Sequence, residues 1–204
     1  MARILPLPTK PAEKLGFRRA RRRKKPDPEL LGQLNLFEPP GGKILPMPSR
    51  RSVFEQALSL DERGDRKARE LYRRAIELET DAADAYCNLG ILECRAGRTE
   101  KAFDCFTRAL QIEPRHLEAH YNLANLYFDL ENLVLAKEHY RFAAEIDPDF
   151  ADVYFNLGLV LTFNQEFEAA RDAFEEYKRR VSPAEGQKAD EWLERLRQAL
   201  AAQQ

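Results

Sequence analysis

Residues 83–116 read ADAYCNLGILECRAGRTEKAFDCFTRALQIEPRH, and residues 117–150, LEAHYNLANLYFDLENLVLAKEHYRFAAEIDPDF, repeat their pattern without a gap. A third copy, ADVYFNLGLVLTFNQEFEAARDAFEEYKRRVSPA, follows at once as residues 151–184. The copies place leucine, small, alanine, aromatic and proline residues at matching positions: Leu89, Leu123 and Leu157; Gly90, Ala124 and Gly158; Ala102, Ala136 and Ala170; Phe106, Tyr140 and Phe174; Pro114 and Pro148. A fixed period of 34 residues predicts a repeat array.

Each copy is predicted to form two helices. In the first copy, apolar and small residues recur at helical spacing on both sides of Gly97, and Pro114 ends the second helix. The small residue Gly90 is expected to face the aromatic Phe106, because a missing side chain lets two helices approach closely while a ring fills the remaining space.

These small, aromatic and proline positions resemble the tetratricopeptide repeat family over roughly residues 50–184. The resemblance implies an all-α fold, an α-solenoid of about four helix pairs that winds as a right-handed superhelix. The expected pairs are residues 50–82, 83–116, 117–150 and 151–184, followed by a capping helix in 185–204 and preceded by a disordered basic arm in 1–49. In the family, the first helix of each pair lines a concave inner face.

The two ends of the array depart from the pattern. Residues 50–82 form a degenerate first copy, in which Thr80 replaces the terminal proline, as suits an end unit that faces solvent on one side. At the other end, Ser182 and Glu185 have capping-box spacing, and Trp192 begins an apolar stripe expected to close the solenoid.

Composition agrees with a solvated helical stack, since 33% of the 204 residues are charged and 44% are hydrophobic. We find neither an apolar run of membrane-helix length nor a secretory signal, and therefore expect a cytoplasmic protein, or a nuclear one if the source is eukaryotic. Cys87, Cys94 and Cys105 lack metal-type spacing, and we expect reduced packing thiols.

The arm has a different composition from the array. Residues 1–49 hold nine of the twelve prolines and carry 11 basic against 4 acidic side chains, a net charge of +7, while the remainder carries −8. Such a segment buries too little apolar surface to offset its ordering entropy, so we expect it to be disordered or extended.

A basic run gives the arm its charge, with seven cations in residues 18–25: Arg18, Arg19, Arg21, Arg22, Arg23, Lys24 and Lys25. Such a run attracts polyanions such as nucleic acid through electrostatics that ignore sequence. The alternatives are a solubilising arm and an arm that folds back on its own acidic repeats.

Two short motifs also lie in the arm. Gln33, Leu34, Leu36 and Phe37 belong to a pentapeptide that resembles the motif by which bacterial proteins dock on the DNA polymerase sliding clamp. The alternative is a tether that packs its leucines on the helices. Residues 3–10, RILPLPTK, return at 43–50 as KILPMPSR, which indicates either two copies of an extended docking peptide or coincidence in a proline-rich segment.

The inner face predicts a peptide-binding groove. Asn88, Asn122 and Asn156 recur 34 residues apart, and an amide both donates and accepts, so a ladder of amides can hold an extended backbone. This ladder resembles the asparagine ladder of O-linked N-acetylglucosamine transferase. Asn125 lies on the same stripe, as do Asp61 and Asp129. The remaining groove candidates are an acidic row and a set of aromatic rings: Asp84, Glu118 and Asp152; Phe54, Tyr121, Phe128, Phe155 and Phe163. An alternative reading of the asparagines is structural, because asparagine is common at this position.

This combination predicts preference for an extended peptide with basic and aliphatic residues. The chain's own arm carries both, so self-docking that a partner must displace is one hypothesis. The carboxylate clamp of chaperone-binding repeats is not expected, because Phe54, Cys87 and Glu118 stand where lysines would be needed.

We find no catalytic motif, and we expect a non-enzyme without a cofactor or a metal. His116 and His120 are four residues apart, but the first lies in a turn, which argues against a metal pair. Two functions remain. The first is an interaction adaptor that binds a partner's peptide, and the alternative is a nucleic-acid-associated factor localised by its basic arm.

Overall fold

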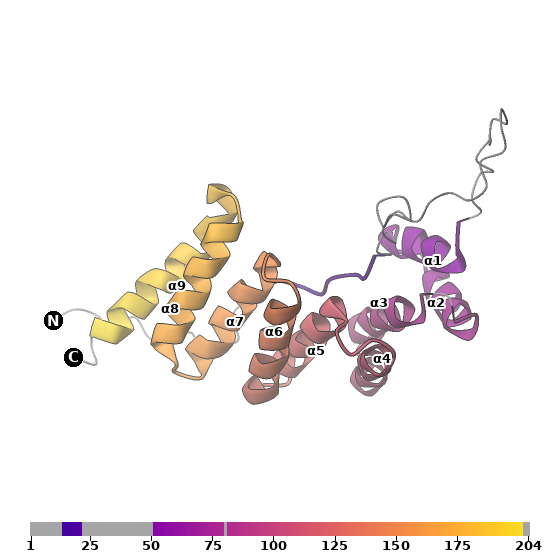
Figure 1. Cartoon of the computed structure of the whole chain (residues 1–204), viewed down its shortest axis with the longest axis horizontal. Coiled ribbons are helices and arrows are strands. Elements are labelled where there is room, and N and C mark those ends of the chain that lie inside the picture. The colour runs from indigo at the N-terminus through magenta and orange to yellow at the C-terminus, as the bar shows by residue number, and fades with distance from the viewer. Residues whose placement is uncertain (1–13, 22–50, 80, 202–204) are drawn as a thin grey trace, which may run out of the picture.

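The computed structural model of the chain describes residues 14–21, 51–79 and 81–201. These residues form nine α-helices and no strand: α1 (Val53–Glu62), α2 (Ala68–Glu77), α3 (Ala82–Arg95), α4 (Thr99–Ile112), α5 (Leu117–Asp129), α6 (Leu133–Ile146), α7 (Ala151–Phe163), α8 (Phe167–Arg180) and α9 (Pro183–Ala201). The helices form four consecutive pairs and a final helix in an elongated stack (Figure 1). The predicted all-α solenoid is therefore confirmed.

Close approach within a pair depends on the small residues that the repeats predicted. A Cβ atom added to Gly90 would lie 2.7 Å from the Phe106 ring, and one added to Gly158 would lie 2.9 Å from the Phe174 ring. Both distances are shorter than carbon atoms tolerate, so an alanine at Gly90 or Gly158 would force the facing ring to move.

The turn inside each pair uses a left-handed backbone at the same repeat position. Gly64 and Gly97 have φ values of 72° and 70°, and Glu131 and Gln165 have 59° and 62° at the matching positions of the next two pairs. Glycine adopts this conformation without strain, whereas side chains with a Cβ atom do not. The third and fourth turns are therefore strained where the first two are not.

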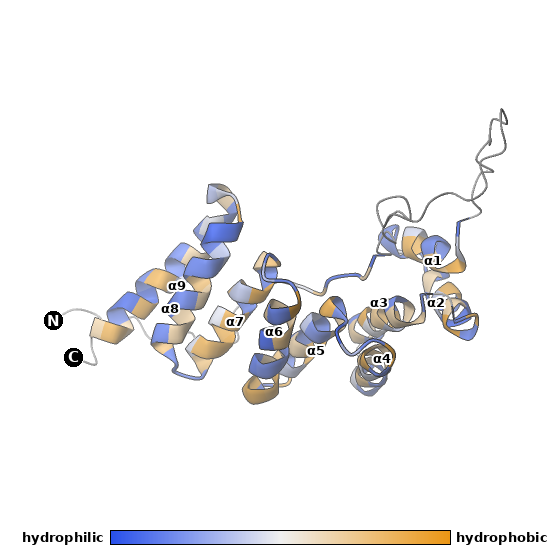
Figure 2. Cartoon of the chain, viewed as in Figure 1, coloured by the Kyte–Doolittle hydropathy of each residue, from blue (hydrophilic) through white to orange (hydrophobic). Residues whose placement is uncertain are grey.

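Successive first helices also contact one another, α3 with α5 and α5 with α7. Figure 2 shows polar and apolar residues interleaved on the helices, as expected when a helix packs on one side and faces water on another. We call the surface of α1, α3, α5 and α7 that contacts residues 14–21 the inner face.

The last helix closes the stack. Glu185 N–H donates to Ser182 Oγ at 3.4 Å, and Ser182 N–H donates to Glu185 Oε2 at 3.2 Å, which confirms the predicted capping box before α9. Trp192 is 9% exposed and stacks on Phe174, with their ring centres 6.1 Å apart. This packing is what the predicted capping wedge requires.

Residues 14–21, the docked segment, have no helix or turn and run extended beside the first helices (Figure 1, indigo). For these eight residues the structure shows the extended alternative of the expectation for the arm, because the inner face supplies hydrogen bonds and counter-charges that offset the ordering entropy. The rest of residues 1–49 lies outside the described residues, as do both copies of the octapeptide and the pentapeptide of Gln33, Leu34, Leu36 and Phe37. Among the described helices, none has the length and apolar character needed to cross a membrane.

Candidate functional site

Three asparagines on the inner face bind the backbone of the docked segment. Asn88 in α3, Asn122 in α5 and Asn156 in α7 have fully buried side chains. The repeat period explains this arrangement, because each asparagine holds the same place on the first helix of its pair. Their shared position turns three separate amides into one row.

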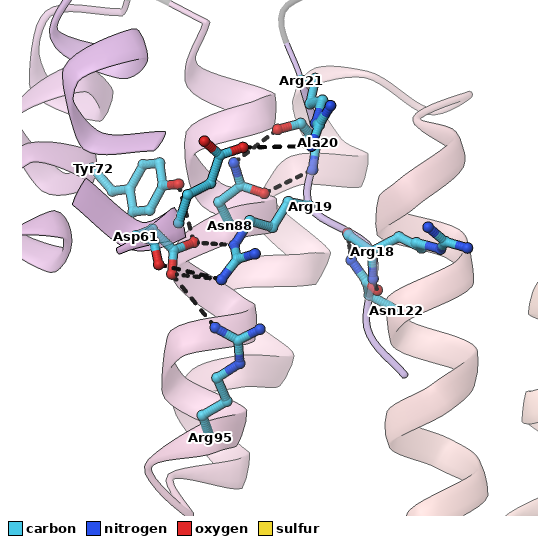
Figure 3. Close-up of polar contacts among 10 residues, drawn as sticks. Arg18, Arg19, Ala20, Arg21, Asp61, Tyr72, Asn88, Arg95 and Asn122 are labelled. Carbon is cyan, nitrogen blue, oxygen red and sulfur yellow. Dashed lines mark hydrogen bonds and ion pairs between the residues drawn. The ribbon is translucent and has the colours of Figure 1, made fainter. Parts of the chain in front are cut away.

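Each amide bonds to both the N–H and the C=O group of a single residue. Asn88 accepts from Ala20 N–H at 2.7 Å and donates to Ala20 C=O at 2.9 Å. Asn122 does the same with Arg18, at 2.8 and 2.7 Å, and Asn156 with Leu15, at 2.8 and 3.0 Å. Figure 3 shows the first two of these pairs. Backbone groups occur in every peptide, so these bonds fix position without reading side chains.

The direction of the docked segment follows from this pairing. Leu15 lies on α7 and Ala20 on α3, so the segment runs antiparallel to the order of the repeats. Between the Asn156–Leu15 pair and the Asn122–Arg18 pair, the Tyr121 hydroxyl lies 3.0 Å from Leu15 C=O and 3.2 Å from Gly16 C=O. Tyr121 is fully buried, and burial raises the pKa of its phenol well above the usual value. It therefore stays a neutral donor at physiological pH.

Asn125 supports the ladder from behind. Its side-chain oxygen accepts from Asn156 Nδ2 at 2.9 Å and from the hydroxyl of buried Tyr140. This contact fixes the orientation of the Asn156 amide. Asn125 therefore positions the ladder, and among the described residues we find no hydrogen bond from Asn125 to the backbone of the docked segment.

A buried carboxylate recognises Arg19. Asp61, at the end of α1, is 3% exposed and receives a two-pronged contact, with Arg19 Nε to Oδ2 at 2.5 Å and Nη2 to Oδ1 at 3.0 Å (Figure 3). Tyr72 Oη and Arg95 Nη1 lie 3.3 and 3.4 Å from the same carboxylate. The Arg19 guanidinium has a raised pKa because of its hydrogen bonds to Asp61. The Arg19–Asp61 pair therefore combines opposite charges with a two-point hydrogen-bonding geometry.

Other cations of the docked segment have weaker or more exposed partners. Arg18 pairs with Asp152 and Lys14 with Asp129, while Arg21 Nη2 lies 3.4 Å from Glu62 Oε1. The side chains of Arg18 and Arg21 are 54% and 77% exposed, so solvent weakens these pairs. Of the basic run, Arg22, Arg23, Lys24 and Lys25 lie outside the described residues.

Ala20 and Phe17 fill apolar space on the inner face. Ala20 is fully buried in a cluster that includes Cys87, Ile91 and Leu123. Phe17 stacks on Phe106 of α4, with ring centres 6.4 Å apart. Of the two, Ala20 has no exposed surface, so a larger side chain there would have to displace its buried neighbours.

The predicted acidic row is divided between two roles. Asp152 pairs with Arg18, whereas Asp84 accepts from His116 Nε2 at 3.0 Å. His116 Nδ1 accepts from Ala119 N–H at 3.2 Å and lies 3.4 Å from Glu118. Asp84 and Glu118 thus help to fix the turn that precedes α5, in addition to lying near the inner face.

The predicted aromatic residues are divided in the same way. Phe54 and Phe155 lie in the core, against Tyr72 at 5.9 Å and Phe174 at 5.5 Å between ring centres. Phe128 and Phe163 pack on each other at 6.0 Å, and Lys14 Nζ lies 6.0 Å from the Phe128 ring.

His116 and His120 point to different partners, since His120 Nδ1 lies 2.9 Å from His139 Nδ1. No group of three potential metal ligands occurs in residues 14–21, 51–79 and 81–201.

The sequence did not predict which residues of the arm and of the array contact each other. The sequence placed Asp61 and Asp129 on the inner stripe, but it did not pair them with Arg19 and Lys14. Ala20, the one small residue within the cationic run, was the available signal for a tight subsite.

Two tetratricopeptide repeat family models match residues 81–149 and 121–185. The chain belongs to the tetratricopeptide repeat family. Among similar solved structures, "First TPR of Spaghetti (RPAP3) bound to HSP90 peptide SRMEEVD" is 23% identical with a TM-score of 0.55, over 58% of this chain and 93% of that one. The first TPR domain of human RPAP3 is 22% identical with a TM-score of 0.53, over 59% of this chain and 93% of that one.

A bacterial structure is also similar, at lower sequence identity. MamA, residues 41 to the end, from Desulfovibrio magneticus RS-1 is 19% identical with a TM-score of 0.54, over 61% of this chain and 71% of that one. At sequence identities of 19–23%, the similarity to these structures supports the fold alone. A search of curated proteins gave no match.

Proposed function

We propose that this tetratricopeptide repeat protein is an interaction adaptor that binds an extended peptide segment of a partner on its inner face. The observation that carries the proposal is the asparagine ladder, in which each of three amides bonds to both backbone groups of one residue. Residues 14–21 then act as an internal occupant, which a partner's segment displaces.

Charge favours a basic peptide as the occupant. Asp61, Asp129 and Asp152 all pair with cations of the docked segment. The HSP90 peptide SRMEEVD, held by one of the structural neighbours, has the opposite character. We therefore expect that peptide not to bind here.

The same contacts favour peptide binding over nucleic-acid binding. Arg19 is engaged by the buried Asp61, so a polyanion that binds Arg19 must first break this pair, and it must also compete with Asp152 and Glu62 for Arg18 and Arg21. We also propose that the protein is not an enzyme. Cys87, the thiol at this face, accepts from Asn122 Nδ2 at 3.3 Å and has a pKa raised well above its usual value by burial. A protonated, buried thiol is not a nucleophile.

The test uses a full-length open chain in which residues 14–21 are replaced by a Gly-Ser stretch of equal length. A fluorescent peptide of residues 12–23 is added, and binding is measured by anisotropy. We expect the peptide to bind the open chain and to lose about 100-fold or more in affinity when Asn88, Asn122 and Asn156 are all changed to Ala. Asn164→Ala, in the turn after α7, is the matched control and should bind normally. Equal binding by the triple variant would overturn the proposal.

A further inference from the structure

The docked segment occupies two subsites with buried partners at adjacent positions of the bound chain. The first surrounds the Arg19 guanidinium at Asp61, and the second surrounds Ala20 at Asn88. Ala20 is the only buried residue among positions 14–21, and Arg19, whose side chain is 27% exposed, is paired with the buried carboxylate of Asp61. Specificity should therefore concentrate at these two positions.

The Asp61 subsite demands a guanidinium. A carboxylate that is 3% exposed needs a close cation, and without Arg19 its remaining cation is Arg95 at 3.4 Å. Arg19 contacts both carboxylate oxygens, and its Nη2 also lies 3.4 Å from the Asp61 C=O group. A planar fork makes these contacts together, whereas the single ammonium of lysine does not.

The neighbouring subsite demands a small residue. Both backbone groups of Ala20 are held by the fully buried Asn88, so the backbone cannot move outward to make room. Cys87, Ile91 and Leu123 are buried in the same cluster and limit the space sideways. A side chain larger than alanine would overpack this cluster or break the ladder.

Combining the subsites gives the chemistry of the partner. Resting on the proposed function, we propose that the inner face selects an extended basic segment containing arginine followed directly by alanine, glycine or serine. The segment runs antiparallel to the repeats. Cations in the places of Arg18 and Lys14, one and five residues before the arginine, add affinity without determining the choice.

The experiment measures peptides of residues 12–23 against the full-length open chain by anisotropy. Every change lies in the peptide, so the repeats are the same in each measurement. We expect Ala20→Leu to weaken binding by about 10-fold or more, Arg19→Lys by about 10-fold and Arg19→Glu by about 100-fold or more. Ala20→Ser should bind within about threefold of the natural peptide.

A composition-matched control separates charge from position. A peptide in which Leu15 and Ala20 exchange places keeps every side chain but leaves no arginine followed directly by a small residue, and it should bind more weakly by about 10-fold or more. If it binds as well as the natural peptide, selection is by net charge alone and the inference is wrong, while the proposed function stands. If the natural peptide itself does not bind, or binds regardless of the three asparagines, the proposed function fails with it.

Discussion

At the scale of the residue, the site depends on asparagine's ability to donate and accept at once. The 34-residue period placed Asn88, Asn122 and Asn156 in one row, so the ladder could be predicted from sequence alone. The register of the docked segment on this ladder could not be predicted from the sequence. Seven cations in residues 18–25 offer several ways to satisfy the acidic side chains, and only packing around Ala20 selects one.

Asp61 is the acidic residue whose loss should matter most. Asp61→Asn keeps the shape but removes the charge that pairs with Arg19, so the docked segment should leave the inner face more often. We expect trypsin to cleave after Arg18 and Arg19 about 10-fold faster, as followed by mass spectrometry.

Glu62→Gln provides the matched control for that variant, because Glu62 holds exposed Arg21 at 3.4 Å. It should change cleavage by less than about twofold. Equal acceleration by the two variants would show that the docked segment is held by net charge and not by the buried pair. Unchanged melting of both variants would show that the repeats remain folded.

At the scale of the element, periodicity predicted the helix pairs, and the strained turns are a finding of the structure. Gly64 and Gly97 predicted two turns from the sequence, whereas the residue types of Glu131 and Gln165 do not predict the left-handed backbone that they adopt. Periodicity was likewise insufficient to place the aromatic residues. Sequence spacing gave their helix face, but the crossing of helices decided that Phe54 and Phe155 belong to the core.

Glycine should relieve the two strained turns. Glu131 and Gln165 are exposed and have φ values of 59° and 62°, so Glu131→Gly and Gln165→Gly remove strain without removing packing. Each should raise the free energy of unfolding by about 0.5–1 kcal/mol, as measured by urea denaturation. Gly97→Ala should lower it by about 1 kcal/mol. A loss of stability in both glycine variants would contradict this account of the turns.

The contact of α5 with α6 should weaken in acid. Burial lowers the pKa of His120, and burial together with His120 lowers the pKa of His139 to about 4. Between pH 6.5 and about 4 the unfolded chain therefore binds more protons than the folded one, so stability falls as the pH decreases. Partial exposure of His139 reduces the effect to about 1–2 kcal/mol.

Urea denaturation at pH 7 and pH 5 measures this dependence. His139→Gln removes the titrating group while keeping a polar side chain, and it should flatten the profile. The same slope in the variant and the natural chain would assign the acid sensitivity to other groups.

At the scale of the whole molecule, the opposite charges of arm and array are brought together. The arm carries +7 and the remainder −8, and the pairs to Asp61, Asp129 and Asp152 show where part of that charge meets. Composition predicted the attraction but not its place, because complementarity between distant segments appears only after folding.

An internal occupant should compete with any added peptide. A tethered segment has an effective concentration on the order of 1 mM, so the natural chain should bind the fluorescent peptide of residues 12–23 at least about 10-fold more weakly than the open chain. Anisotropy titrations of both chains measure the ratio. Equal affinities would mean that residues 14–21 do not guard the inner face.

Amide hydrogen exchange of the docked segment in the natural full-length chain tests the central claim most directly. The asparagine ladder predicts slow exchange at Leu15, Arg18 and Ala20, whose N–H groups donate to Asn156, Asn122 and Asn88. Gly16, Phe17, Arg19 and Arg21 should exchange faster, and changing the three asparagines to Ala should abolish the pattern. Uniformly fast exchange across residues 14–21 in the natural chain would contradict the account.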